Sequence, residues 1–514
     1  MAVQSSVGPD ERVVFGGSRL VARADEPPGP ADWGVLAAAL ALQLGLIWRV
    51  QAFITDDAFI SLRYARNLAD GYGPVWNPGG PAVEGYSNPL LVLLEAAAFR
   101  LAEDGGIVVA RGLGVLSAVG LVVVIWRLGR PVIGPLAANA AALVVAGLPA
   151  LAYWSVGGLE TLPIILVMTT STLLLARDDG GSAPVIGVLL ATLPWLRPEG
   201  LALAAALVFF SEITGLLRRD ERGTTLRRLA WLAGIPLVSQ VALQALRWVW
   251  FGHLVPNSVI YKTGTGEFGE VTAKFLMETT PILALAAAGF FLVAPRAKLL
   301  AVIPAVYLVA GMTFRDSVNT FSRLVLPALP LLAILAAAAL PGALTTLRNG
   351  RLRRGVLGVA AVGLAGVFVV VGPVSVRDIG PNADGYMECR HAAREQAGSY
   401  LADTTPADTV IAMGDAGVVP FTAQRTTLDL FGLNEAQLQE LGPTPAQFRA
   451  DQALAAAPDR FVLASRDADE FVDHYSVERR VQASEGFEDA YSLEQVTSGG
   501  DHCGYHLFIY ARDG

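Results

Sequence analysis

Two adjacent aspartates, Asp56 and Asp57, follow the first long apolar run of the chain, which covers residues 33–54. Ionised carboxylates are costly in hydrocarbon, so we expect both side chains to face water or a polar cavity. A carboxylate at a membrane surface can take a proton from a hydroxyl group. The pair therefore predicts an acid–base centre at the rim of a membrane enzyme, and the sequence leaves open which aspartate acts. The alternative is a solvated helix end without chemistry.

Further charged, polar and aromatic side chains occur in segments that we expect on the same side of the membrane. They are Glu84, Tyr86, Asn88, Glu160, Arg197, Glu199, His253, Asn257, Tyr261, Lys262, Arg315 and Arg323. Cationic side chains bind phosphate, and a carboxylate can remove a hydroxyl proton. Aromatic rings can cover the apolar faces of a sugar. The set predicts a site for a ligand that carries both phosphate and sugar.

Several of these residues also have a purely structural interpretation. Glu160 precedes an apolar segment, where an acid stabilises the positive end of a helix dipole. Arg197 and Glu199 flank a proline and can pair with each other. Lys262 can extend toward the membrane surface, and Tyr261 can belong to an interfacial aromatic belt. These alternatives stay open at the level of the sequence.

The composition is that of an integral membrane protein. The chain has 514 residues, of which 53% are hydrophobic and 16% are charged, and its mean hydropathy is +0.48. Soluble domains carry about a quarter charged residues. The net charge of −8 gives no indication of nucleic-acid binding. Residues 1–31 are polar and lack a cleavable signal, so we expect a disordered cytoplasmic tail.

Apolar runs long enough to act as spanning helices predict about eleven transmembrane segments. Their approximate ranges are 33–54, 107–126, 134–152, 161–176, 183–196, 200–217, 229–250, 274–294, 298–313, 323–341 and 355–373. The segment 90–102 is too short to span and predicts an interfacial helix. The transmembrane domain is thus expected over residues 32–375, with a first outer loop at 55–105.

Basic residues set the orientation, because cytoplasmic loops are enriched in arginine and lysine. With a cytoplasmic N-terminus, the cytoplasmic turns hold the arginine-rich clusters around 127–130, 177, 218–228, 296–298 and 348–354. An odd number of spans then places the C-terminal region and the Asp56–Asp57 pair outside. A second doublet, Asp178-Asp179, falls in a cytoplasmic turn, so adjacent aspartates alone are weak support for a site.

The region 380–514 has more charge and short strand-like runs at 409–413, 461–464 and 506–510, with a helical stretch at 389–402. This pattern predicts an extracytoplasmic α/β domain. Cys389 and Cys503 can form a disulfide in an oxidising compartment, and two free thiols are the alternative.

Several motifs together resemble the polytopic glycosyltransferases of the GT-C fold, which use polyprenyl-phosphate-linked sugars. The first loop reads Gly-Tyr-Gly-Pro-Val-Trp-Asn-Pro at 71–78 and Glu-Gly-Tyr-Ser-Asn-Pro at 84–89. Later motifs include Gly-Leu-Glu-Thr at 158–161, Leu-Arg-Pro-Glu-Gly at 196–200, Pro-Asn-Ser at 256–258, Gly-Asp-Ala-Gly at 414–417 and Asp-Leu-Phe-Gly-Leu-Asn at 429–434. Within that fold the chain looks most like the bacterial branch that includes terminal arabinofuranosyltransferases.

The resemblance implies a role for each matching residue. The catalytic base is Asp56 or Asp57, and Glu160 orients the acceptor or a bound cation. Candidates to hold the lipid phosphate are Arg197, Lys262, Arg315 and Arg323. No cofactor is required, although a divalent cation near Asp56, Asp57 and Glu160 is possible. The implied donor is a polyprenyl-phosphate sugar, and the implied acceptor is a glycan or lipid. The implied location of the protein is a bacterial plasma membrane, where membrane lipids surround it.

Three other functions stay open from the sequence. A transporter or flippase for lipid-linked solutes would be expected to show an internal repeat and charges near mid-membrane. A non-catalytic membrane scaffold would tolerate replacement of the first-loop carboxylates. A transferase of the same fold could move a different group, for example a hexose or an aminosugar, to lipid A, a glycan or a protein.

Overall fold

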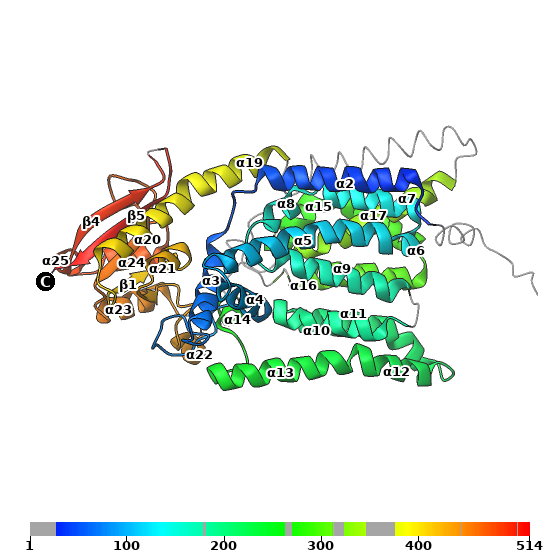
Figure 1. Cartoon of the computed structure of the whole chain (residues 1–514), viewed down its shortest axis with the longest axis horizontal. Coiled ribbons are helices and arrows are strands. Elements are labelled where there is room, and N and C mark those ends of the chain that lie inside the picture. Colours follow the sequence, from blue (N-terminus) through cyan, green and yellow to red (C-terminus); the bar gives the residue numbers. More distant parts are fainter. Residues whose placement is uncertain are drawn as a thin grey trace, which may run out of the picture.

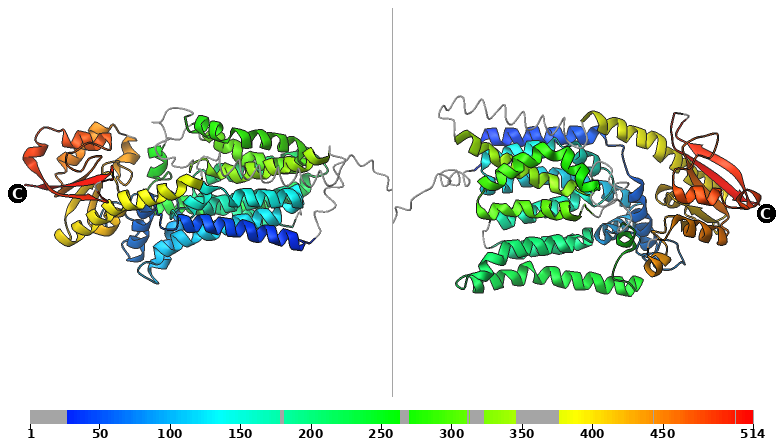
Figure 2. Two further views of the ribbon diagram at one scale, coloured as in Figure 1. Left: turned by 90° about the horizontal axis from the view of Figure 1, so that it is seen from above. Right: turned by 180° about the vertical axis from the view of Figure 1, so that it is seen from behind.

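The computed structural model describes residues 27–177, 181–262, 270–310, 312, 323–345, 376–442, 444–500 and 502–513. A long bundle of helices carries a smaller α/β domain at one end, which we call the tail domain (Figure 1). Helix α19 (Val376–Gly385) leads from the bundle into the tail domain, as two further views also show (Figure 2).

The helices of the bundle run along its long axis. They are α2 (Pro30–Arg49), α5 (Gly105–Leu128), α6 (Arg130–Ile133), α7 (Pro135–Ala146), α8 (Pro149–Ser155), α9 (Thr161–Arg177), α10 (Ala183–Leu196), α11 (Gly200–Leu217), α12 (Arg222–Leu232), α13 (Gly234–Phe251), α15 (Glu270–Leu292), η1 (Pro295–Ala301), α16 (Val302–Ala310), η5 (Leu326–Ala328) and α17 (Leu329–Thr345). One continuous hydrophobic core joins all of these helices except α13, which packs against α10.

Among the described residues, four helical segments are long and apolar enough to cross a bilayer, namely α2, α5, α11 and the continuous stretch Arg222–Phe251. A fifth span is possible if α7 and α8 count as one, although they meet at 59°. Pro149 at the start of α8 has no amide hydrogen to continue α7, which explains the bend. The chain is therefore a membrane protein. The expected number of eleven stays a prediction, because helices such as α9, α10 and α17 have 17, 14 and 17 residues and 355–373 lies outside the described residues.

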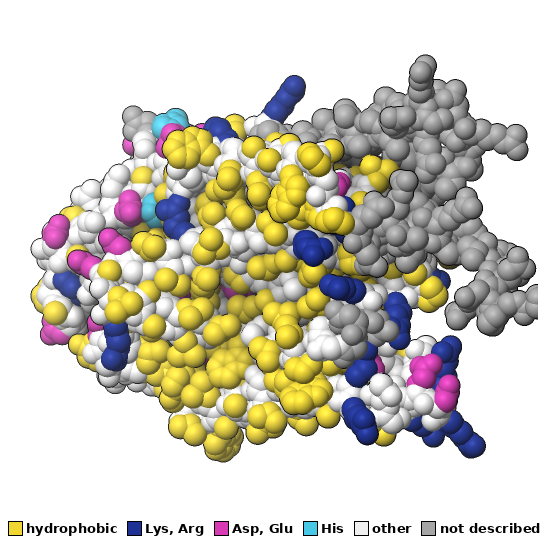
Figure 3. Space-filling model, turned by 45° about the vertical axis from the view of Figure 1, so that its right-hand side comes forward, with side chains coloured by type: hydrophobic (Ala, Val, Ile, Leu, Met, Phe, Trp, Pro, Cys, Tyr) yellow, Lys and Arg dark blue, Asp and Glu magenta, His cyan; other side chains and the backbone are white. Residues whose placement is uncertain are grey.

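Large apolar side chains cover the outer surface of the bundle. Leu237, Val238, Val241, Trp248 and Val249 on α13 are all more than half exposed, and Figure 3 shows hydrophobic side chains spread widely over this part of the molecule. Such a surface is incompatible with water and suits contact with lipid. The arginine-rich turn between α11 and α12 lies at the end of the bundle away from the tail domain (Figure 1).

Three shorter helices lie between the bundle and the tail domain: α3 (Asp56–Ala69), α4 (Pro89–Phe99) and α14 (Asn257–Lys262). Helix α4 has 11 residues, in line with the expectation that 90–102 is too short to span. The turn after α3 contains Gly71 and Gly73 with φ of +92° and +89°. Glycine adopts this left-handed conformation without strain, so the loop can fold back on α3.

The tail domain is built on a five-stranded sheet of order β2-β1-β3-β5-β4. Strands β1 (Val410–Met413), β2 (Thr426–Asp429) and β3 (Arg460–Ser465) are parallel, whereas β4 (Tyr491–Ser498) and β5 (His506–Arg512) form an antiparallel hairpin beside β3. The expected strands correspond to β1, β3 and β5. The sequence did not predict strands β2 and β4, because their outward-facing residues are polar.

Helices cover both faces of the sheet. They are the π-helical turn η6 (Tyr386–His391), α20 (Ala392–Thr404), α21 (Val418–Ala423), α22 (Gln437–Leu441), α23 (Ala446–Ala455), α24 (Ser476–Gln482) and α25 (Phe487–Ala490). Side chains of β3 alternate between the faces: Val462 and Ala464 pack toward α20, and Phe461 and Leu463 pack toward α23 and α24. This arrangement gives the domain a core of its own.

A disulfide joins Cys389 in η6 to Cys503 in the connection between β4 and β5. Their Cα atoms lie 5.4 Å apart across a sequence separation of 114 residues. The bridge fastens the first helix of the tail domain to its last strands.

Candidate active site

A cavity of about 350 Å³ lies where the first outer loop, the bundle and the tail domain meet. Its lining includes seven of the residues expected from the sequence, which are Asp56, Asp57, Tyr86, Asn88, Glu160, Tyr261 and Arg323. The tail domain contributes Gly414, Asp415, Ala416, Asp429, Phe431, Leu433 and Tyr475. Segments that are distant in the sequence thus line one cavity, and several of its lining residues are charged or polar.

Asp56 is the first residue of α3, and the tail domain holds it in place. Its Oδ1 accepts a hydrogen bond of 2.9 Å from the backbone amide of Val418, and the Arg394 guanidinium lies 3.5 Å away. Its own backbone amide donates to the Tyr386 hydroxyl at 2.8 Å. Gly417 permits this approach, because a methyl group there would overlap Asp56. Among the described residues no hydrogen bond reaches Oδ2, so this oxygen is available to a substrate.

Burial raises the pKa of Asp56 to about 6, although the nearby Arg394 opposes this increase. The carboxylates of Asp415 and Asp57 add to the increase by like-charge repulsion. A carboxyl group with this pKa is mostly ionised at neutral pH, yet it has a higher proton affinity than an exposed aspartate. These properties suit a general base.

Asp57 points into the cavity and is held from the side of the bundle. Its side chain is 56% exposed, and its Oδ2 accepts a hydrogen bond of 2.9 Å from Nη1 of Arg323. The guanidinium of Arg323 also lies 5.1 Å from the ring centre of Trp154. Arg323 is therefore a positioned cation on the wall of the cavity.

Glu160 immediately precedes α9 and is buried at the cavity wall. It accepts a hydrogen bond of 2.9 Å from Nδ2 of Asn88, whose Oδ1 accepts from the Ser61 hydroxyl at 3.0 Å. Nε of Arg197 lies 3.8 Å from Glu160 and 2.7 Å from Glu199. Arg197 and Glu199 thus pair with each other, as the structural interpretation expected, and they stand behind the cavity.

Other expected residues lie outside the cavity lining. Glu84 is buried against Arg247 of α13, at 2.9 Å, and burial raises its pKa to about 7. His253 is exposed on a loop and borders a much smaller pocket. Asn257 donates to the backbone oxygens of the tail domain at Leu433 and Glu435, at 3.0 and 2.9 Å. These residues join parts of the chain to one another.

Two of the residues expected in the site have no described side chain. Arg315 lies outside the described residues, and of Lys262 only the helical backbone of α14 is described.

Sequence reasoning missed the residues with which the tail domain holds Asp56. Arg394 in α20 pairs with Asp415 at 2.7 Å as well as with Asp56, and its Nη1 donates to the Tyr386 hydroxyl at 3.2 Å. Tyr505 also donates to Asp415. The one signal in the sequence for these residues was the Gly-Asp-Ala-Gly motif, which contains Asp415. Arg394 and Tyr386 lie in an ordinary amphipathic stretch that gives no such signal.

The first outer loop and the tail domain are joined by many direct contacts. Asn77 exchanges two hydrogen bonds with the backbone of Thr427, at 2.9 and 3.0 Å, along the outer edge of strand β2. The hydroxyl of Tyr64 donates to Oδ1 of Asn434 at 3.1 Å. Arg63 donates to the backbone oxygens of Pro420 and Arg425. Because these contacts are buried or partly buried, they fix the tail domain over the cavity.

In this arrangement each of the three acidic residues already has a hydrogen-bond or ion-pair partner within the chain. Oδ1 of Asp56 is held by Val418 and Arg394, Asp57 is bound to Arg323, and Glu160 already has Asn88 as a donor. Among the described residues, no three metal-ligating side chains converge at the cavity. Arginines occupy the positions where a cation could neutralise these carboxylates.

Comparisons with known proteins identify the fold. ArnT from Cupriavidus metallidurans bound to undecaprenyl phosphate matches with a TM-score of 0.58 at 13% identity, over 94% of this chain and 98% of that one. Its apo form gives a TM-score of 0.61 at 13% identity, over 93% and 98%. The Archaeoglobus fulgidus oligosaccharyltransferase tethered to an acceptor peptide with the sequence NVT gives 0.55 at 14% identity, over 94% and 74%. This chain has a GT-C fold.

Within the GT-C fold, the tail domain carries a separate sequence signature. A family model described as a domain of unknown function, DUF8728, matches residues 385–507. No curated protein matches the chain. The GT-C likeness at this identity concerns the fold, so the reaction has to be argued from the cavity.

Proposed function

We propose that this protein is a membrane glycosyltransferase that moves a sugar from a polyprenyl phosphate to a hydroxyl group of a cell-envelope glycan or lipid. The main support for this proposal is a cavity at one end of an apolar bundle. It combines a buried base, Asp56, with a positioned cation, Arg323. ArnT, which shares the fold, was crystallised with undecaprenyl phosphate. A donor with a polyprenyl tail would stay in the bilayer and present its phosphate at this level.

The proposed reaction is a single displacement. Oδ2 of Asp56 takes the proton of the acceptor hydroxyl as its oxygen attacks the anomeric carbon, and the bond from that carbon to the phosphate oxygen breaks. The polyprenyl phosphate leaves with the bonding electrons, and Arg323 stabilises its charge. Arg323 turns from Asp57 to the phosphate, and Asp57 keeps it aligned in the empty site. Glu160 and Asn88 orient the acceptor.

The donor sugar and the orientation belong to the same proposal. We infer a pentose or hexose donor, with the arabinofuranosyltransferase-like branch as the first candidate because of the motifs at 158–161, 196–200, 256–258, 414–417 and 429–434. The tail domain and the cavity lie outside the plasma membrane of a bacterium, and the N-terminus lies in the cytoplasm. The arginine-rich turn at the opposite end of the bundle supports this orientation.

The decisive experiment is transfer by the purified full-length protein in lipid nanodiscs. Labelled polyprenyl-phosphate pentoses and hexoses are supplied with a cell-envelope glycan fraction, and the labelled products are separated. We expect one donor class to lose its label to the acceptor in the wild type and not in Asp56→Asn. Movement of intact labelled donor between leaflets, without transfer, would establish a flippase instead.

A further inference from the structure

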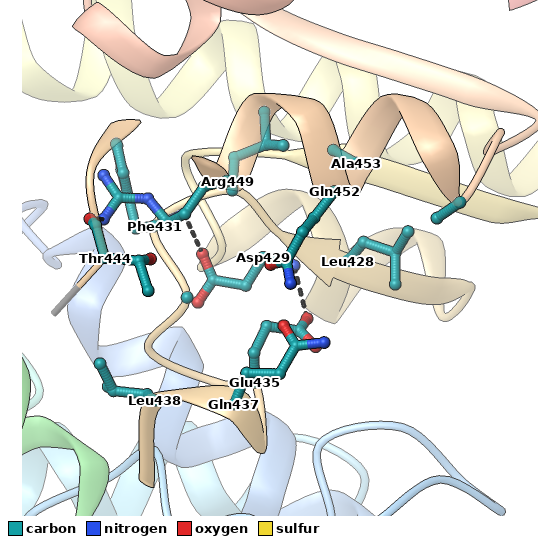
Figure 4. A pocket seen from close by; sticks show the side chains of 13 residues that line it. Leu428, Asp429, Phe431, Glu435, Gln437, Leu438, Thr444, Arg449, Gln452 and Ala453 are labelled. Atoms are coloured by element: carbon teal, nitrogen blue, oxygen red, sulfur yellow. Dashed lines mark hydrogen bonds between the residues drawn. The ribbon is translucent and has the colours of Figure 1, made fainter. Parts of the chain in front are cut away.

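A second pocket, of about 120 Å³, lies wholly within the tail domain. It is lined by Leu428, Asp429, Leu430, Phe431, Gly432, Glu435, Gln437, Leu438, Thr444, Arg449, Gln452, Ala453 and Ala456. Figure 4 shows Asp429, Glu435, Gln437 and Gln452 gathered on one side, with Thr444 and Arg449 across from them. No function described above uses this pocket.

The pocket opens beside the carboxyl end of β2, which is one of three parallel strands. The chain passes from β1 to β2 on one side and reaches β3 on the other side of β1, so the direction of winding reverses between β1 and β3. Ligands of open α/β sheets bind outside the carboxyl ends of the strands near such a reversal. The pocket lies at this carboxyl edge of the sheet, one strand away from the reversal.

The polar groups in the wall favour an uncharged ligand with hydroxyl groups. The pocket holds two carboxylates, from Asp429 and Glu435, against the single guanidinium of Arg449, which disfavours a phosphate or carboxylate ligand. Both oxygens of Asp429 accept hydrogen bonds within the loop, from Phe431 and Asn434 at 2.9 and 3.0 Å, so they are not available to a metal ion.

Other polar groups in the pocket remain open to a ligand. Oε1 of Glu435 accepts from the backbone amide of Asp429 at 2.9 Å. Among the described residues, no hydrogen bond reaches the side-chain amides of Gln437 and Gln452 or the hydroxyl of Thr444. Each amide group can donate and accept, as recognition of a sugar hydroxyl requires.

The pocket adjoins the catalytic cavity, since Asp429 and Phe431 line both. All of its lining residues lie between positions 428 and 456, and none comes from a spanning helix. A ligand therefore reaches it from the aqueous side, whereas a lipid-linked donor arrives through the bundle. The volume suits one small ring rather than an extended chain.

We propose that this pocket binds one neutral sugar ring of the acceptor glycan, next to the residue whose hydroxyl attacks the donor. The inference rests on the proposed function and specifies its acceptor as a glycan. The side chains of Glu435 and Gln452 bind the hydroxyl groups, and the ring of Phe431 separates the bound sugar from the reacting one.

Equilibrium binding in the absence of donor tests this inference. The full-length protein in nanodiscs is titrated with arabinose, mannose and galactose disaccharides, and with glucuronate as an anionic control. We expect at least one neutral disaccharide to bind more tightly than glucuronate. We also expect its affinity to fall about tenfold in Gln452→Leu and in Glu435→Gln, through the loss of hydrogen bonds to the ligand.

Gln447→Ala is the matched control, because Gln447 stands on the same helix, α23, but outside the pocket. It should bind the disaccharide like the wild type, and all three variants should keep the thermal unfolding midpoint of the wild type. In transfer assays, the pocket variants should raise the KM for acceptor and leave the KM for donor unchanged.

Two outcomes separate the inference from the proposed function. If no neutral disaccharide binds better than glucuronate, or if both pocket variants bind it like the wild type, the sugar site is wrong even when transfer is intact. If disaccharide binding is lost in the variants but no donor is ever consumed, the sugar site stands and the proposed transferase function is wrong.

Discussion

The two walls of the catalytic cavity hold neighbouring aspartates in different ways. On the side of the tail domain, Asp56 is 13% exposed and held by Val418 and Arg394. On the side of the bundle, Asp57 is 56% exposed and bound to Arg323. Although the two aspartates are adjacent in the sequence, Asp56 is largely shielded from water and Asp57 is largely exposed to it. The comparison suggests that the first is a base of fixed orientation and the second a counter-ion that a phosphate can replace.

The largest expected effect separates the two aspartates directly. Asp56→Asn removes the base while preserving the shape of the side chain, so transfer should fall by about 10² to 10⁴-fold. Asp57→Asn should reduce it far less, because the cavity keeps its base. Initial rates at saturating donor measure both variants, with thermal unfolding as the control for folding. Equal losses of transfer in the two variants would show that Asp56 and Asp57 do not have different roles.

The next effect concerns the cation on the bundle side. Arg323→Gln removes the charge that binds the donor phosphate, so the KM for donor should rise about tenfold. Arg323→Lys keeps the charge and should recover part of the affinity. The KM is measured over a donor series at fixed acceptor. A KM that stays at the wild-type value in Arg323→Gln would remove this residue from the site.

A smaller effect should distinguish Arg394 on the tail side. Wild-type kcat/KM should rise with pH through about 6, because the ionised form of Asp56 is the base and burial raises its pKa to about 6. Arg394 opposes that increase, so Arg394→Met should move the midpoint upward by about one pH unit. At pH 6 the ionised fraction then drops from about one half to about one eleventh, which is roughly a fivefold loss of rate.

The matched comparison is Arg323→Gln, whose midpoint should stay closer to that of the wild type. A loss of rate in Arg394→Met at every pH without a shift of the midpoint would assign Arg394 to folding alone.

The smallest expected effect is the removal of metal ions. Because the arginines already neutralise the three cavity acids, dialysis against EDTA should leave the transfer rate within about twofold. Added Mg²⁺ or Mn²⁺ should have equally little effect. A rate that collapses with EDTA and returns with one of these ions would show that the acids rearrange to bind a cation.

The sequence was sufficient to predict which acidic residues lie together, because these residues carry their signal locally. Asp56, Asp57 and Glu160 follow or precede apolar runs, and the structure places all three at one cavity. Strands β1, β3 and β5 were predictable because their runs of apolar residues are unbroken. The bent pair α7 and α8 appeared in the sequence as one span, because hydropathy does not report direction.

The remaining features depend on contacts between distant segments. Arg394 looks like any arginine on an amphipathic helix until α20 is brought against α3. Glu84 was expected in the ligand site because of its motif, but its partner Arg247 lies 163 residues later, in the segment expected to span the membrane at 229–250. The short strand β2 depends on Asn77 of the first loop for its outer edge, which no periodicity of β2 itself could indicate.

The order in which the chain is made gives the Val418–Asp56 contact a further meaning. The amide that orients Asp56 lies 362 residues after it, and the disulfide at η6, the turn that precedes the helix of Arg394, needs Cys503 between β4 and β5. During synthesis Asp56 is therefore made long before the groups that orient it. A partly made chain has the acid without these partners, and on the proposed function we expect transfer only after strands β4 and β5 have folded.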